Sequence, residues 1–271
     1  MTDWFLGTIG FTYPEWKGSF YPTGLPAAQS LTYYSKIFNA VEINTTFYGA
    51  QPPAQLQRWA GATSPDFRFC LKAPKRITHE LRLAGSALDE FRAFVDASSA
   101  LGGQLGAILI QMPPSFKADE WPTLLQWIAH LPDEIANQRV RYAIELRHAS
   151  WHEPEMCARL TDLLSQHQVG WVAADYEDLP VTIHNTAPFL YVRWIGKHNV
   201  LDHPGFEVID RSARLQSWVE RLRPYLDTLE GVFGFFDNDY AGHAPASVNR
   251  LKTLLRQPIQ LPPQGEQGRL F

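Results

Sequence analysis

The chain alternates between two hydrophobic periodicities along most of its length. Eight short runs are rich in β-branched and aromatic residues, as buried strands are: 5–11, 41–47, 67–73, 106–112, 142–147, 170–175, 189–195 and 232–237. Seven segments between them carry apolar residues at helical spacing: 27–38, 54–62, 86–101, 120–131, 153–167, 212–229 and 245–255. This alternation predicts parallel strands joined by crossover helices.

The number of strand and helix units predicts a (β/α)8 TIM-type barrel, because eight such units fit in roughly 250 residues. An open doubly wound sheet is the alternative. However, the stretch 7–16 contains only Gly7 and Gly10, which do not have the glycine spacing of a dinucleotide site. The sixth crossover, 176–188, has no helical period, so we expect a loop or a short helical turn there. We expect one barrel domain over 1–256 and a flexible tail over 257–271, which is rich in Pro, Gln and Gly.

Composition narrows the class of protein. A chain of 271 residues with 45% apolar residues can bury a large core. The net charge of −4 argues against a sequence-blind nucleic-acid binder, which needs a broad basic surface, although a local basic cleft stays possible. Cys70 and Cys157 have neither metal-ligand nor disulfide-framework spacing. Because the chain shows no signal-peptide pattern at its start and no bilayer-length apolar run, we expect a cytosolic protein.

Several of these runs resemble the YecE-like family, domain of unknown function 72. The matching stretches are "YPEWKGSFYP", "FNAVEINTTFY", "FRFCLKAPKRITH", "ILIQMPPSF", "AIELRHASW" and "FFDNDYAGHAPASVNRL". The resemblance implies a TIM-type barrel. It implies no activity, because a proposed similarity of this family to endonuclease IV-like and sugar-isomerase-like barrels is an analogy of fold.

Polar residues stand at the last inward-facing positions of the predicted strands. Alternate residues of a barrel strand point inward, and the carboxyl ends of the strands carry the active site in this fold. The alternation gives Glu42, Asn44, Lys72, Gln111, Glu145, Arg147, Asp175, Tyr191, Arg193, Asp237 and Asn238. Mutual neutralisation of buried charges is the alternative explanation for this pattern.

The predicted cluster suits an anionic ligand. Lys72, Arg147 and Arg193 would hold the anion, and Glu42 or Glu145 would transfer protons. Lys72 and Asp175 are further catalytic candidates, and Asn44, Gln111, Asn238 and His243 are further ligand-binding candidates. His243 lies in the loop before the last helix, where backbone N–H groups can face a phosphate. We therefore expect a metal-independent hydrolase or lyase that acts on a phosphorylated or nucleic-acid-like ligand.

Aromatic residues follow the same strand ends. Flat rings there could stack on a sugar or a nucleobase, although packing is the alternative for each of them: Tyr13, Trp16, Tyr48, Trp151 and Tyr240.

Three other functions stay open. A metal site would use His79, His148 and His243 with the carboxylates, but three nearby cations would repel a divalent ion, so we expect neither a metal nor a cofactor. A glycoside hydrolase could use Glu42 and Glu145 if their carboxyl groups lie ~5 to 9.5 Å apart. A third possibility is a binding module that recognises a nucleic-acid end or a partner without turnover and is recruited to the sliding clamp by the C-terminal tail.

The chain ends in "QGRLF", which resembles the peptide that binds the bacterial sliding clamp. Leu270 and Phe271 would enter an apolar groove, and Gln267 would fix the register. Such a contact would link the barrel to DNA replication or repair.

A pulldown tests this tail. We expect the full chain to retain the sliding clamp, and a version ending at Gln264 to lose it because both apolar anchors are gone. Equal retention by the two proteins would dismiss the tail as the contact.

Overall fold

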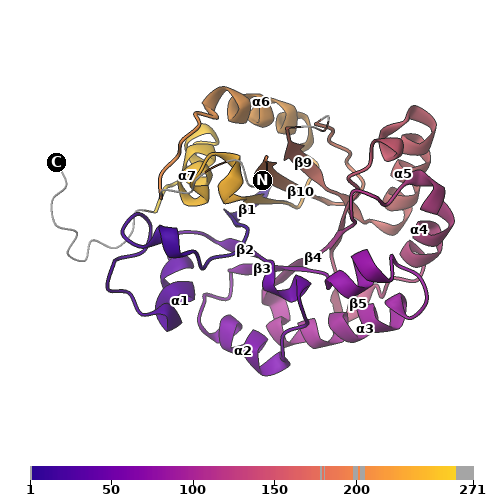
Figure 1. The fold of residues 1–271 in the computed structure, drawn as a ribbon, viewed down its shortest axis with the longest axis horizontal. Coiled ribbons are helices and arrows are strands. Elements are labelled where there is room, and N and C mark those ends of the chain that lie inside the picture. Colours follow the sequence, from indigo (N-terminus) through magenta and orange to yellow (C-terminus); the bar gives the residue numbers. More distant parts are fainter. Residues whose placement is uncertain (1, 178, 180, 198–200, 202–204, 261–271) are drawn as a thin grey trace.

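Parallel strands lie at the centre of the protein and helices surround them (Figure 1). The computed structural model describes residues 2–177, 179, 181–197, 201 and 205–260. The eight predicted strands appear as β1 (Asp3–Thr8), β2 (Ala40–Ile43), β3 (Arg68–Lys72), β4 (Leu105–Gln111), β7 (Tyr142–Glu145), β8 (Gly170–Trp171) with β9 (Ala173–Tyr176), β10 (Phe189–Gly196) and β11 (Gly231–Phe236). They pair in parallel in the orders β2-β3-β4-β7-β8 and β1-β11-β10-β9. The predicted α/β fold of the TIM-barrel type is confirmed.

The helices lie outside the strands (Figure 1). They are α1 (Ser30–Tyr34), α2 (Pro53–Gly61), α3 (Ala87–Ser98), α4 (Trp121–Ile128), α5 (Pro154–His167), α6 (Ser212–Leu222) and α7 (Ala244–Leu254). The predicted helix 212–229 ends early, because Pro224 lacks the N–H that would continue it, and a 3-10 turn follows over Arg223–Tyr225. The described residues of the sixth crossover contain no helix, as predicted. In the part of the chain that the structure describes, no helix is long and apolar enough to span a bilayer.

One small element was not predicted. β5 (Glu134–Ile135) and β6 (Gln138–Arg139) form an antiparallel hairpin before β7. Its two turn residues, Ala136 and Asn137, have φ of 48° and 61°. Only Asn137 is a residue type that favours this left-handed region, so the sequence carried little signal for the turn.

Two apolar clusters fill the fold. The larger one lies between the strands and the helices, and the smaller one fills the barrel interior. The interior cluster consists largely of small and aromatic inward-facing residues, among them Ala40, Cys70, Ala107, Ala143, Tyr191, Phe233 and Phe235. Because this packing fills the lower part of the barrel, polar inward-facing side chains are confined to the carboxyl ends of the strands.

Side chains join β1 to β2 at one seam of the barrel. The Thr8 N–H donates to Tyr34 Oη at 2.8 Å, and Tyr34 Oη donates to the Ala40 carbonyl at 3.1 Å. The Leu6 N–H donates to Asn39 Oδ1 at 2.9 Å. These side chains therefore satisfy backbone groups that a strand partner would otherwise pair.

The opposite seam lies inside the sixth strand. β8 pairs with β7, and β9 pairs with β10, so the strand passes from one sheet to the other at Val172. The Val172 N–H still donates to the Ile144 carbonyl at 2.9 Å. The alternation continues through this break, because Gly170 pairs with Ala143 and Ala174 pairs with Arg193.

Gly7 tests the first seam. A Cβ at this position would lie 1.8 Å from the Ala40 carbonyl oxygen, so the two strands would have to separate. We expect Gly7→Ala to lower the free energy of unfolding by about 2–3 kcal/mol in urea denaturation. The control is Gly24→Ala, where an added Cβ meets no atom within 4 Å and the change should stay within about 0.5 kcal/mol. Equal stability of the two variants would contradict the close approach.

Candidate functional site

Polar side chains from six strands meet at the carboxyl end of the barrel, which we call the mouth. The mouth cluster consists of Glu42, Lys72, Gln111, Glu145, Arg147, Tyr176, Tyr191 and Arg193. All but Arg147 are buried. Seven of the residues predicted from the strand alternation are thus brought together, although the chain separates them widely.

Arg193 lies at the centre of the cluster. Its Nε and Nη2 donate to the two carboxylate oxygens of Glu42 at 3.0 and 2.9 Å. Its Nη1 donates to Glu145 Oε2 at 2.5 Å. Burial alone would lower the pKa of Arg193, but the two carboxylates raise it well above its usual value. One guanidinium therefore neutralises two buried carboxylates, a geometry that the planar fork of Arg suits and Lys does not.

Glu145 is held as a carboxylate. Gln111 Nε2 donates to its Oε1 at 2.9 Å, and Tyr176 Oη donates to the same oxygen at 2.6 Å. Burial would raise the pKa of Glu145, but Arg193 and Arg147 overcome it and lower the pKa to about 2. Glu145 therefore stays ionised near neutral pH and cannot act there as a general acid.

Glu42 has its own set of partners. Besides Arg193, Tyr191 Oη donates to Glu42 Oε2 at 2.9 Å. The backbone carbonyl of Glu42 accepts from the Gly10 N–H at 2.7 Å, beside the seam between β1 and β2. The side chain is completely buried, so a ligand has no open route to it in this conformation.

Lys72 has a different environment from the other charged groups. Among the residues that the structure describes, its ammonium has no carboxylate within 4 Å and no hydrogen-bond acceptor. Its Nζ lies 4.0 Å from the centre of the Phe47 ring. Burial, together with the positive charge of Arg193, lowers the pKa of Lys72 to about 8. Lys72 is therefore a buried cation close to losing its proton at neutral pH.

Arg147 is the cation that solvent reaches. Its side chain is 20% exposed, and its Nε lies 3.8 Å from Glu145 Oε1. Its guanidinium carbon lies 4.8 Å from the centre of the Tyr176 ring. Arg147 and Tyr176 form part of a cavity of about 350 Å³, together with Pro114, Glu177, Leu179, Gly196 and Lys197. This cavity gives an incoming ligand access to the rim of the mouth cluster.

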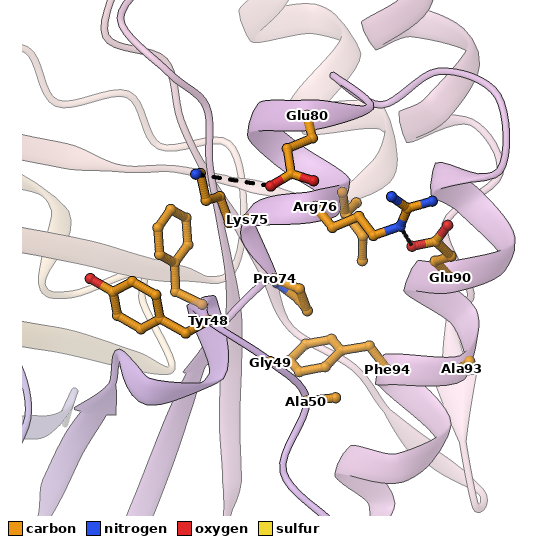
Figure 2. Close-up of a pocket in the computed structure, with 12 residues that line it drawn as sticks. Tyr48, Gly49, Ala50, Pro74, Lys75, Arg76, Glu80, Glu90, Ala93 and Phe94 are labelled. Carbon is orange, nitrogen blue, oxygen red and sulfur yellow. Dashed lines mark hydrogen bonds and ion pairs between the residues drawn. The ribbon is translucent and has the colours of Figure 1, made fainter.

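A second cavity, of about 430 Å³, lies beside the mouth between the loops after β2 and β3 and helix α3 (Figure 2). Pro74 and Phe94 line the cavity, and the ring of Tyr48 lies apart from that of Phe94 (Figure 2). Phe47 also lines the cavity. Lys75 pairs with Glu80 and Arg76 pairs with Glu90 around this cavity. Because Phe47 also contacts Lys72, this largely apolar cavity adjoins the charged cluster.

His79 lies on the short π-helix Arg76–Glu80 and packs against Phe47, with 5.0 Å between the ring centres. Burial, with the charges of Lys72 and Arg147, lowers the pKa of His79 to about 4. The ring is therefore neutral near pH 7. Within the described residues, no three His, Cys, Asp or Glu side chains converge as a metal site requires.

Asp175 does not face the mouth, contrary to the prediction. Arg214 Nε donates to both of its oxygens at 2.9 Å, and Trp218 Nε1 donates to its Oδ2 at 2.7 Å, so α6 holds the carboxylate on the outside of the barrel. Tyr176 takes the inward position instead, with Val172 below it. Gly170 and Ala174, two small residues, share the inward face with Tyr176 and were the sequence evidence for this alternation. The prediction instead followed the polar residue at the expected end of the strand.

Asn238 and its neighbours also have structural roles. Asn238 Oδ1 accepts from Trp16 Nε1 at 3.1 Å and from the Ala244 N–H at 3.0 Å, so it links the first loop to the start of α7. His243 is buried edge-on against Trp16, and burial lowers its pKa to about 4. Asn238, Trp16 and His243 are buried among one another, so this packing gives their predicted ligand contacts no support.

The other predicted aromatic residues divide by exposure. Trp151 is completely buried and donates to the Phe116 carbonyl at 2.8 Å, and Tyr240 is buried against Phe236, so neither ring can stack on a ligand. Tyr13 is half-buried, and its hydroxyl donates to the carbonyl of Ile9. Tyr48 is 85% exposed at the edge of the second cavity.

The structure leaves two further predictions untested: the ligand contact of Asn44 and the clamp contact of the C-terminal tail. Asn44 is half-buried at the end of β2, and its Oδ1 is buried without a hydrogen-bond partner among the described residues. Gln267, Leu270 and Phe271 lie outside the described residues, so the clamp contact stays a prediction.

Solved structures share this fold. A DUF72 family protein from Thermotoga maritima matches with a TM-score of 0.76 and 25% identity, covering 94% of this chain and 100% of that one. A DUF72 family protein from Enterococcus faecalis matches with a TM-score of 0.72 and 20% identity, covering 95% and 99%. The class is therefore that of the DUF72 α/β proteins.

The family model "Protein of unknown function DUF72" matches residues 5–268, and the chain belongs to this family. UPF0759 protein YunF of Bacillus subtilis is 29% identical over 91% of this chain and 94% of its own length. UPF0759 protein YecE of Escherichia coli is 33% identical over 53% of this chain, a match that spans about half, 48%, of YecE.

The low pKa of Glu145 predicts a pH dependence of stability. A carboxyl group with a lowered pKa stabilises the fold above its unfolded pKa, and this contribution is lost as the pH falls towards about 2. We expect Glu145→Gln to cost about 3 kcal/mol at pH 7 and to flatten the loss of stability between pH 5 and 2 in urea denaturation. Glu134→Gln, at an exposed position, is the control and should follow the wild type. If the free energy of unfolding varied with pH in parallel for the wild type and Glu145→Gln, Glu145 would not have the lowered pKa.

Proposed function

We propose that the mouth binds an anionic ligand, phosphorylated or nucleic-acid-like, and that the protein is a metal-independent hydrolase or lyase in which Lys72 transfers the proton. The supporting observation is the Lys72 side chain, which is only 8% exposed and whose ammonium lacks a carboxylate or hydrogen-bond partner among the described residues. An unpaired buried charge costs several kcal/mol. An anion at the mouth would offset that cost.

Arg147 supplies the second cation of this proposal. It lines the 350 Å³ cavity and is partly exposed, so a ligand reaches it from solvent. Arg193, by contrast, already donates three N–H groups to Glu42 and Glu145. We therefore assign Arg193 the role of positioning the two carboxylates, and assign the anion to Lys72 and Arg147.

The pKa values of Glu145 and Lys72 indicate which of the two can transfer a proton near neutral pH. The pKa of about 2 keeps Glu145 ionised, whereas the pKa of about 8 lets Lys72 exchange its proton near neutral pH. A general acid or base is most effective when its pKa is close to the working pH. Lys72 therefore suits this role better than Glu145.

The second cavity would take the uncharged part of the ligand. Its volume of about 430 Å³ is within the range of small-molecule sites, and its walls are largely apolar. The exposed ring of Tyr48 offers a stacking surface for a nucleobase or sugar. Phe47 lines this cavity and also contacts Lys72, so the two regions are adjacent and one ligand can extend over both.

The glycoside hydrolase alternative loses support from this geometry. Glu42 and Glu145 share one guanidinium, and a general acid in that mechanism needs a raised pKa, whereas that of Glu145 is lowered. A binding module without turnover differs from our proposal only in lacking a reaction.

Anion binding by the mouth is tested by titration calorimetry with inorganic phosphate and adenosine monophosphate. We expect Lys72→Met to weaken both by about ten-fold, because one charge-assisted contact is lost. Wild-type affinity should fall as the pH rises through about 8, where Lys72 loses its charge. Lys75→Met is the control, since Lys75 is 53% exposed and pairs with Glu80.

Unchanged affinity in Lys72→Met would refute the anion site. Turnover of a phosphoester panel by the wild type, lost in Lys72→Met, would establish the hydrolase. No turnover by either protein, with binding intact, would favour the binding module.

A further inference from the structure

Lys72 differs from the other buried cations of the described chain. Three Lys or Arg side chains are buried there: Lys72, Arg193 and Lys252. Arg193 binds two carboxylates, and Lys252 Nζ donates to the Ile37 carbonyl at 3.2 Å. Lys72 alone of the three has neither kind of partner among the described residues. No group among the described residues accepts a hydrogen bond from its ammonium.

The surroundings of Lys72 favour the neutral amine. The Phe47 ring lies 4.0 Å from Nζ, and the positive charges of Arg193 and Arg147 act on it from the same cluster. Removal from water and neighbouring cations are the two means by which proteins convert a lysine into a nucleophile. A lysine needed only to attract an anion would gain nothing from losing its charge.

We infer that Lys72 is a nucleophile that forms an imine with a phosphorylated aldehyde or ketone bound at the mouth. This inference rests on the proposed function, because the same cations would hold the phosphate, and it narrows the substrate to a carbonyl compound. It also favours the lyase over the hydrolase, since an imine draws electrons from a neighbouring carbon–carbon or carbon–hydrogen bond.

The step balances without an oxidant or reductant. The Lys72 nitrogen attacks the carbonyl carbon, a carbon–nitrogen bond forms, and the carbonyl oxygen becomes a hydroxyl. That hydroxyl then leaves as water, taking up the second amine hydrogen, and the product is the imine. When a solvent proton adds to the imine nitrogen, the positive charge returns to the place of the ammonium.

The rest of the cluster suits that product. Glu42 and Glu145 act electrostatically on Lys72, and Arg193 fixes both carboxylates. A protonated imine has the same charge as the ammonium that it replaces, so the cluster needs no rearrangement to stabilise it.

Pyridoxal 5′-phosphate, a phosphorylated aldehyde, is the probe. The full chain is incubated with it, reduced with borohydride and digested, and peptide mass spectrometry locates the label. We expect Lys72 to be labelled about ten-fold faster than Lys75, although Lys75 is far more exposed. Excess inorganic phosphate should slow this labelling.

The pH dependence separates the inference from the proposed function. Labelling of Lys72 should become faster as the pH rises through about 8, whereas phosphate affinity should become weaker. Lys72→Arg keeps the positive charge but cannot form this imine, so it should retain phosphate binding and lose the label. Lys75→Met should keep the label on Lys72.

Two results would overturn these proposals separately. Labels that follow exposure and spare Lys72, in a protein that binds phosphate, would refute the imine and leave the anion site intact. A wild type that does not bind phosphate, and whose labelling phosphate does not slow, would refute the proposed function itself.

Discussion

The shared guanidinium of Arg193 is the interaction on which the mouth depends. It joins β10 to β2 through Glu42 and to β7 through Glu145, across the interior of the barrel. Two buried carboxylates and one buried cation would each be costly alone, and their close, multiply hydrogen-bonded arrangement offsets that cost. Tyr191 and Gln111 supply further donors to the same carboxylates. The cluster therefore links three strands of the fold and is also the candidate functional site.

This arrangement divides the charged residues into two groups with different duties. Arg193 and the two glutamates satisfy one another, and the lowered pKa of Glu145 keeps that carboxylate ionised near neutral pH. Lys72 and Arg147 are the cations to which our proposal assigns the ligand, one packed against Phe47 and the other at the cavity rim. The positive charge of Arg193 lowers the pKa of Lys72 as well. The ion-paired part of the cluster thus alters the electrostatic environment of Lys72.

Strand alternation placed much of the candidate site correctly. Glu42, Lys72, Glu145 and Arg193 lie on regular strands, where every second residue faces inward, so their direction follows from local geometry. The prediction for Asp175 was wrong because the other set of alternate residues in the sixth strand faces inward. Ala174 pairs with the inward-facing Arg193, and Val172 and Tyr176 belong to the interior cluster. Loop residues followed no such rule, so the burial of Trp151 and the exposure of Tyr48 could not be told apart in advance.

The sequence by itself determined the order of strands and helices, the α/β class and the set of polar residues at the strand ends, because each follows from periodicity within a short segment. Only the tertiary structure decided which charges neutralise one another. Glu42 and Arg193 are 151 positions apart, and their contact depends on how several strands are placed around the interior. The isolation of Lys72 was decided in the same way, because the partners of a buried charge are set by distances that no local pattern encodes.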